Sequence, residues 1–206
     1  MARSTLLPHY ETGDVRIDRY VVGPFENNVF VVRCKRTGEA VLLDAANEHE
    51  LLREVCEESG VRTVLTTHGH WDHIQAIIPL RELGIRIGIA TDDATMLPAY
   101  DFVIDDDIGM SVGDLQLVTL HTPGHTPGST CFQLSGHPIL FSGDTLFPGG
   151  PGTTALPGGD FTAVIHSLED RLFQLPGEMM VLPGHGQDTT IGTERPHLDE
   201  WVARGW

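Results

Sequence analysis

Four side chains that commonly bind metal ions lie within six consecutive residues of this chain. The apolar stretch 61–65 leads directly into them, and they are His68, His70, Asp72 and His73. Imidazole and carboxylate groups are common ligands of metal ions, and a bound cation is the simplest reason for four of them to gather at one strand end. The spacing His-x-His-x-Asp-His therefore predicts that the chain folds around one or two bound cations.

Three further candidate ligands share one context, in which an apolar strand is followed by glycine and then by the donor residue. His125 lies in Thr-Pro-Gly-His, Asp144 in Phe-Ser-Gly-Asp and His185 in Leu-Pro-Gly-His-Gly. The flanking glycines let the backbone turn sharply and let a bulky partner approach. Loops at strand ends are also where binding sites are commonly built. We therefore expect these three side chains to meet the first four in one cleft.

Seven donors are too many for one tetrahedral Zn²⁺, which uses about three protein ligands in a catalytic site. They suit two ions about 3.5–4 Å apart. Asp144 is the expected bridge, because the two oxygens of a carboxylate can face both ions. We expect two divalent ions, Zn²⁺ in the first place, with iron or manganese as alternatives. Such ions make hydroxide available near neutral pH, so the chain is predicted to hydrolyse a substrate without a serine or cysteine nucleophile.

The charge and hydropathy of the chain exclude several classes of function. The net charge is -16 and Lys35 is the only lysine, so the basic surface of a nucleic-acid-binding protein is lacking. No apolar run reaches the roughly 18 residues of a membrane span, and the start of the chain is too polar for a secretory signal. The scattered Cys34, Cys56 and Cys131 suit reduced thiols. We expect a cytoplasmic protein with a small-molecule substrate, and we interpret the acidic runs 92–93 and 105–107 as solvated surface.

Strands and helices interleave along the chain. Asn47 is the expected N-cap of a first helix, with Glu50 as its capping-box partner. A second helix is expected over 74–83, broken near Pro79, and Asp160 is expected to begin a third. A last helix is expected over 194–203. The stretches that predict strands are 15–22, 29–34, 40–43, 61–66, 85–90, 115–120, 129–134, 138–141 and 178–182.

Two architectures fit this order of elements. Two mixed sheets packed face to face, with helices outside, would bury the strand runs of both halves. A single doubly wound sheet is the alternative. The region 91–108 is expected to be irregular or short helix, and the glycine- and proline-rich stretch 147–159 is expected to be a loop.

The motifs, taken in order, resemble the metallo-β-lactamase-fold hydrolase superfamily. These motifs are His-x-His-x-Asp-His, Pro-Gly-His, Gly-Asp-Thr-Leu-Phe and Pro-Gly-His-Gly. Within the superfamily the chain is most similar to small bacterial glyoxalase II-like proteins, from about Asn27 to Glu194. The resemblance implies an α+β fold, a four-layer αβ/βα sandwich of two mixed β-sheets with helices on the outer faces. It also implies a single domain over 1–206, without the C-terminal helical domain that binds glutathione in full-length glyoxalase II.

The resemblance assigns a role to each candidate. It makes Asp144 the bridge between two ions and places Asp44 beside the site as a supporting residue. Asp72 and Asp144 are expected to have catalytic roles as well. The remaining ligands are divided between a first ion, held by His68, His70 and His125, and a second ion, held by Asp72, His73 and His185.

The activity implied by the resemblance is hydrolysis of a small thioester, of hydroxyacylglutathione type or of a related acyl thiol, by attack of a metal-bridging hydroxide. Two alternatives stay open. One is a persulfide dioxygenase that uses a single Fe(II) held by His68, His125 and Asp144. The other is a lactone hydrolase. Trp71 either lines the cleft or packs in the core, and His121 is interpreted as a supporting or purely structural residue.

Overall fold

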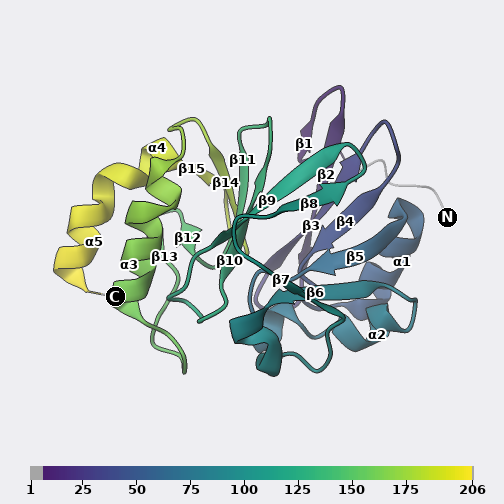
Figure 1. Ribbon diagram of the computed structural model, residues 1–206, viewed down its shortest axis with the longest axis horizontal. Coiled ribbons are helices and arrows are strands. Elements are labelled where there is room, and N and C mark those ends of the chain that lie inside the picture. Colours follow the sequence, from purple (N-terminus) through teal and green to yellow (C-terminus); the bar gives the residue numbers. More distant parts are fainter. Residues whose placement is uncertain (1–6, 206) are drawn as a thin grey trace.

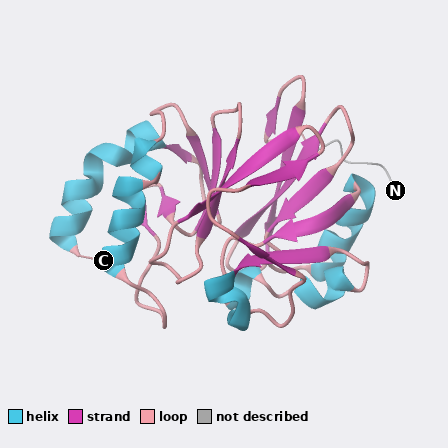
Figure 2. Cartoon of the chain, viewed as in Figure 1, coloured by secondary structure: helices cyan, strands magenta, loops and turns pink. Residues whose placement is uncertain are grey.

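The chain folds into two β-sheets that pack face to face, with helices on the outside of each sheet (Figures 1 and 2). The computed structural model describes residues 7–205. The strands of the first sheet lie side by side in chain order: β1 (Tyr10–Glu11), β2 (Val15–Val22), β3 (Asn27–Cys34), β4 (Ala40–Leu43), β5 (Val61–Leu65), β6 (Arg86–Ala90) and β7 (Phe102–Ile104).

The second sheet is built from the C-terminal half of the chain in the spatial order β15-β14-β11-β10-β9-β8. Both sheets are mixed. The parallel strands are β4 to β7 in the first sheet and β11 with β14 in the second, and the other neighbouring strands are antiparallel. The expected pair of mixed sheets is therefore confirmed, and the single doubly wound sheet is excluded. The strands are β8 (Gly109–Val112), β9 (Leu115–His121), β10 (Thr130–Leu134), β11 (Ile139–Gly143), β14 (Met180–Pro183) and β15 (Thr189–Thr190), and a separate hairpin contains β12 (Leu146–Phe147) and β13 (Gly150–Pro151).

Helices form the two outer layers of the sandwich. Figure 1 shows α1 and α2 on the outside of the first sheet and α3, α4 and α5 beyond the second. The α-helices are α1 (His49–Ser59), α2 (Ile77–Arg81), α3 (Phe161–Asp170), α4 (Ile191–Glu194) and α5 (Leu198–Arg204), and the 3₁₀ turns are η1 (Trp71–His73), η2 (Thr91–Met96), η3 (Leu172–Gln174) and η4 (Arg195–His197).

Apolar side chains fill the space between each pair of adjacent layers. Phe30 and Leu43 of the first sheet meet Phe132 and Phe141 of the second in the central layer, all at most 3% exposed. Burial of such a side chain contributes about 1.5–3 kcal/mol. Two further layers of the core lie between the helices and the sheets. In the layer beside the first sheet, α1 contributes the buried side chain of Leu52. The packing thus fixes the position of every strand that leads into the site.

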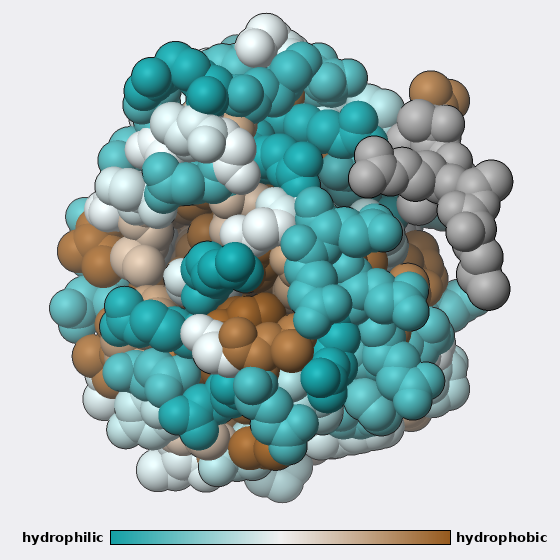
Figure 3. Space-filling view, turned by 90° about the vertical axis from the view of Figure 1, so that its right-hand side faces the viewer, coloured by the Kyte–Doolittle hydropathy of each residue, from teal (hydrophilic) through white to brown (hydrophobic). Residues whose placement is uncertain are grey.

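Figure 3 shows one face of the molecule coloured by hydropathy. Hydrophilic residues cover most of this face, and hydrophobic residues gather in a recess near its centre (Figure 3). Among residues 7–205, no helix has the length and hydrophobicity needed to cross a bilayer.

The first helix begins differently from the expectation, so the predicted capping box is wrong. Glu48 is the N-cap residue, with a left-handed backbone (φ 49°) and without a side-chain hydrogen bond to the helix. The Asn47 side chain instead accepts the Glu48 N–H and donates to Gln75 Oε1 at 2.6 Å. It also lies against Gly23, where an added Cβ would come within 2.8 Å of Asn47 Cβ. Tertiary contacts therefore replace the local cap.

The helix expected over 74–83 is much shorter, because its first residues bond elsewhere. Only Ile77–Arg81 is α-helical. The backbone N–H groups of Gln75 and Ala76 donate to the carbonyls of Ala46 and Ala45 instead of starting a helix. Pro79 lies in the first turn of α2, where no intrahelical N–H is needed, so it does not break the helix. These bonds tie the chain after His73 to the end of β4.

Short strands and turns account for the other differences. The region 91–108 contains η2 and the edge strand β7, and the unpredicted β8 pairs with β9 as a hairpin. The glycine-rich stretch contains the small β12–β13 hairpin. The last expected helix is divided into α4, η4 and α5, with proline at the start of η4. Strands of two to four residues have too few positions to show a clear alternation in sequence.

Candidate metal centre

The seven predicted ligands all lie at one edge of the sandwich, because they follow strands that end there. The segment 68–73 follows β5, His125 follows β9, Asp144 follows β11 and His185 follows β14. Strands β9 and β11 are each antiparallel to β10, and β14 is parallel to β11, so all three end at the same edge of the second sheet. The topology thus carries four separate sequence motifs to one place.

Backbone hydrogen bonds join the two sheets at this edge. Thr130 N–H donates to the carbonyl of Thr67 at 2.8 Å, and Asn28 N–H donates to the carbonyl of Gly184 at 2.7 Å. The Asn28 side chain adds bonds to the carbonyls of Pro183 and Gly186, both at 3.0 Å. The site is therefore placed on the line where the sheets meet, rather than on either sheet alone.

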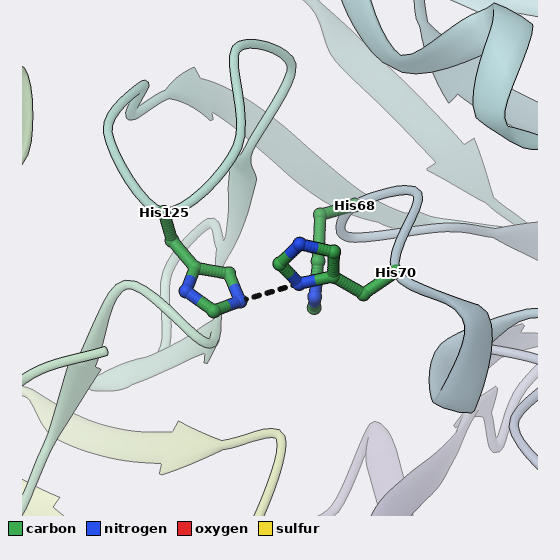
Figure 4. Close-up of side chains that lie close together, drawn as sticks. All are labelled: His68, His70 and His125. Atoms are coloured by element: carbon green, nitrogen blue, oxygen red, sulfur yellow. Dashed lines mark hydrogen bonds between the residues drawn. The ribbon is translucent and has the colours of Figure 1, made fainter. Parts of the chain in front are cut away.

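One set of donors, which we name the first group, comprises His68, His70 and His125 (Figure 4). The three ligand nitrogens lie within 4.8 Å of one another. His70 Nδ1 is 2.8 Å from His125 Nε2, and Figure 4 shows these rings approaching each other from two different loops. Three imidazoles that converge in this way fit the coordination of a transition-metal ion.

The second group comprises Asp72, His73 and His185, again with donor atoms within 4.8 Å of one another. His185 Nε2 lies 3.3 Å from Asp72 Oδ2 and 3.2 Å from His73 Nε2. Asn27 Nδ2 donates to Asp72 Oδ2 at 2.9 Å and so orients that carboxylate. A mixed set of two imidazoles and one carboxylate is compatible with the same ions as the first group.

Asp144 lies between the two groups. Its carboxylate oxygens are 3.6 Å from His125 Nε2 on one side, and 3.5 Å from His73 Nε2 and 3.6 Å from His185 Nε2 on the other. Gly184 makes room for this carboxylate, since an added Cβ there would lie 2.3 Å from Asp144 Oδ1. The position is the one that a bridging ligand requires.

Three of the imidazoles donate a hydrogen bond through Nδ1, and this turns their Nε2 atoms toward the centre. His125 donates to the carbonyl of Thr153, and His185 to that of Phe25, each at 2.8 Å. His73 donates to Asp44 Oδ2, also at 2.8 Å. Because these acceptors have no proton to give, Nδ1 carries a proton in each of the three rings, and Nε2 is the nitrogen left to bind an ion.

His68 also donates through Nδ1, but its acceptor is the hydroxyl of Thr67, which in turn bonds to Asp44. Thr67 Oγ1 donates to Asp44 Oδ2 at 2.9 Å, so toward His68 Nδ1, at 3.0 Å, it acts as an acceptor. His68 Nε2 and Asp144 Oδ1 are then buried without a hydrogen-bond partner. Buried polar atoms almost always have partners, and a metal ion would satisfy both of these. The donor set therefore fits divalent cations.

Burial and neighbouring charges set the protonation of the site. Burial lowers the pKa of His68 well below its usual range, and the nearby imidazole of His73 lowers it further, so the ring is neutral and ready to coordinate. Burial also acts to lower the pKa of His73, but the carboxylates of Asp144 and Asp44 outweigh it and raise that pKa well above its usual range. In the metal-free chain a proton on His73 thus occupies the centre, and a binding ion must displace it.

Several residues at the site were missed or placed differently by the sequence patterns. Asn27 is a polar residue at the start of an apolar strand, a signal that could have pointed to it. Asp93 is fully buried beside the first group, so the interpretation of 92–93 as solvated surface is wrong for this residue. Trp71 is 56% exposed and meets Phe25 edge to face at 5.2 Å, so it lies on the surface and not in the core. His121 bonds to the carbonyl of Pro127 and to none of the seven donors.

The comparison with known proteins decides the family. A family model described as the metallo-beta-lactamase superfamily matches residues 22–185. The chain belongs to this superfamily. As a member, the chain is 32% identical to the hydroxyacylglutathione hydrolase GloC of Haemophilus influenzae, over 76% of this chain and 84% of that protein. It is also 32% identical to the mitochondrial persulfide dioxygenase ETHE1 of Homo sapiens, over 73% of this chain and 60% of that one.

A solved structure supports the same assignment. The crystal structure of TTHA1623 in a di-iron-bound form matches this superfamily member with a TM-score of 0.77 and 31% identity, covering 86% of this chain and 96% of the other. The metallo-β-lactamase fold expected from the motifs is confirmed. Membership of the superfamily and the clustered histidines and aspartates together indicate a metal-dependent enzyme.

Proposed function

We propose that this protein is a binuclear metal-dependent hydrolase of small thioesters. The first group would hold one ion, the second group would hold the other, and Asp144 would bridge them. The observation that carries the proposal is the convergence of two donor groups on either side of one carboxylate. We expect Zn²⁺ as the native metal, with iron or manganese as alternatives, since imidazole and carboxylate ligands suit all three.

The site residues prepare the reaction by fixing donor atoms in place. When bound, two divalent cations supply a water that is reactive at neutral pH and an electrophile for a carbonyl oxygen. Asp44 holds both His73 and the Thr67 hydroxyl, which orients His68 in turn. Asn27 fixes the Asp72 carboxylate in the second group. Supporting hydrogen bonds of this kind raise ligand basicity and limit the freedom of the rings.

The proposed substrate is a thioester of hydroxyacylglutathione type or a related acyl thiol, which the similarity to GloC supports.

Protein purified without added metal should contain two metal ions per chain by elemental analysis. The metal-loaded protein should release free thiol from S-lactoylglutathione. Background from the protein's own thiols should be low, because Cys34, Cys56 and Cys131 are all buried. Absence of turnover would exclude this substrate, and a panel of other thioesters and lactones would then be assayed.

Trp71 and Phe25 are proposed to contact the substrate beside the second group. Both side chains are more than half exposed, and Phe25 is also joined to His185 through its carbonyl. We expect Trp71→Ala to raise KM for the thioester about 2- to 10-fold, the range that a lost aromatic contact gives, with kcat and metal content close to wild type. Val202→Ala, an exposed residue on α5, is the control and should change neither. An unchanged KM in Trp71→Ala would contradict this assignment.

A second candidate function is supported by the similarity to persulfide dioxygenase ETHE1. His68, His125 and Asp144 would then hold a single Fe(II), as two histidines and one carboxylate do in non-haem iron oxygenases. Metal analysis separates the two functions. One iron per chain together with oxygen uptake on a persulfide would replace the hydrolase proposal, whereas two ions with thiol release from a thioester would support it.

A further inference from the structure

A buried carboxylate outside the seven donors connects the two loops that carry the first group. Asp93 lies in η2, directly after β6, and is fully buried, while its neighbour Asp92 is exposed. Its Oδ2 accepts the backbone N–H of Gly69 at 2.8 Å and the hydroxyl of Thr126 at 2.7 Å. Its Oδ1 accepts the backbone N–H of Gly128 at 2.7 Å.

These three donors lie next to the ligands of the first group. Gly69 stands between His68 and His70, and Thr126 follows His125 in the chain. A single carboxylate therefore holds the β5 loop and the β9–β10 turn at a fixed separation. The three imidazoles of the first group come from these two loops alone.

The backbone of both loops packs so closely against η2 around Asp93 that two positions have no room for a side chain. A Cβ on Gly128 would lie 2.7 Å from the Asp93 carboxyl carbon, and a Cβ on Gly69 would lie 2.6 Å from Cβ of Met96, also in η2. Glycine at both positions lets η2 pack directly on the two loops. Gly69 and Gly128 are therefore both required to be small by the packing of η2.

The chemistry of the contact requires a carboxylate. All three bonded groups are donors, and an ionised carboxylate has acceptor sites on both oxygens. An asparagine of nearly the same shape would turn its NH₂ toward at least one of these donors and leave that bond unmade. Hydrogen bonds to a charged acceptor are also stronger than those to a neutral one. The charge itself is stabilised by these donors in the buried position.

The second group has separate supports. Asp72 is held by Asn27, His73 by Asp44 and His185 by the carbonyl of Phe25. None of these bonds involves Asp93, whose side chain bonds to Gly69, Thr126 and Gly128 on the two loops of the first group. Loss of the Asp93 carboxylate should therefore act on one group and not on both.

We infer that Asp93 is a positioning residue that sets the metal affinity of the first group selectively. The inference rests on the proposed function, because it assumes that the first group binds an ion. Without the carboxylate, the two loops lose the side chain that bonds to both of them. The backbone bond from Thr130 N–H to the carbonyl of Thr67 remains, but His125 is held less firmly opposite His68 and His70. The geometry of the first group then becomes variable, while the second group stays as it is.

The test compares wild type with Asp93→Asn by titration of the metal-free proteins with Zn²⁺ against a chromophoric chelator. We expect the affinity of one site to fall about 10- to 100-fold, the usual effect of removing a supporting hydrogen-bond partner, and the other to stay within about 2-fold. The Co²⁺-loaded variant should lose the absorption of one ion and keep that of the other. Asp101→Asn is the control: Asp101, directly before β7, likewise accepts a backbone N–H, that of Ile87, at 2.9 Å, and its other partner is Arg81, which is not one of the seven donors.

A milder variant covers the case in which Asp93→Asn does not fold. Thr126→Val removes only one of the three bonds to Asp93 and should lower the affinity of the same site by a smaller factor. Two sites of wild-type affinity in these variants, or an equal loss at both sites, would overturn the inference while the proposed function stands. A wild-type protein that binds no ion would overturn both.

Discussion

Replacing Asp144 by alanine is expected to lower bound metal and activity together. The carboxylate faces both donor groups, with one buried oxygen that has no other partner. Its removal takes a ligand from each proposed ion. It also removes the negative charge between the two cations, so they repel each other more strongly. We expect kcat/KM for the thioester to fall by more than about 100-fold, because loss of even a supporting residue costs about 10- to 100-fold. Elemental analysis should show fewer than two ions per chain.

The control for this variant is Asp14→Ala, which removes an exposed carboxylate of the β1–β2 turn that bonds to Thr12 and His137. It should keep both ions and full activity. Full activity with full metal content in Asp144→Ala would refute the bridging role. Loss of activity with both ions retained would instead point to a role of the carboxylate in the chemical step.

Each metal ion removed is expected to lower the unfolding temperature by about 8–16 °C. An ion that binds only the folded chain adds about 4 kcal/mol of stability when its free concentration is about 1,000 times Kd. For a chain of this size, 1 kcal/mol corresponds to about 2–4 °C in Tm. The metal-free protein also keeps the two buried atoms without partners, His68 Nε2 and Asp144 Oδ1. Thermal unfolding of chelator-treated and Zn²⁺-reloaded samples measures the difference.

Two controls would attribute the change in Tm to metal binding at this centre. Reloading with Zn²⁺ should restore the original Tm, which separates metal binding from irreversible damage. Asp144→Ala should show a smaller difference between its metal-free and metal-loaded forms than wild type does. Equal unfolding temperatures with and without chelator would contradict a centre that stabilises the fold.

The site could be predicted from the sequence largely because its ligands occur in short motifs. The spacing of His68, His70 and His73 is already unusual over six residues. His125, Asp144 and His185 each follow an apolar strand and a glycine, and parallel strand ends meet at one edge of a sheet. The residue types and local order were thus sufficient to bring seven distant positions together, and all seven do converge in the structure.

The supporting residues could not be predicted, because their partners are distant in the chain. Asp93 is next to an exposed aspartate, and only the fold shows that it faces Gly69 and Gly128. The same reason explains the error at Asn47, whose side chain bonds to Gln75 and not to the nearby helix. A local pattern shows what a residue could bond nearby, and a stronger partner brought by tertiary packing replaces that bond.

Each donor group takes members from both halves of the chain. The segment 68–73 supplies four donors, but the first group also needs His125, and the second needs His185, 112 residues after His73. A nascent polypeptide leaving the ribosome therefore carries an incomplete set for most of its synthesis. If the chain binds two ions as proposed, both could be held firmly only after translation has passed His185 and the two halves have packed together, so full metal binding would indicate a folded chain.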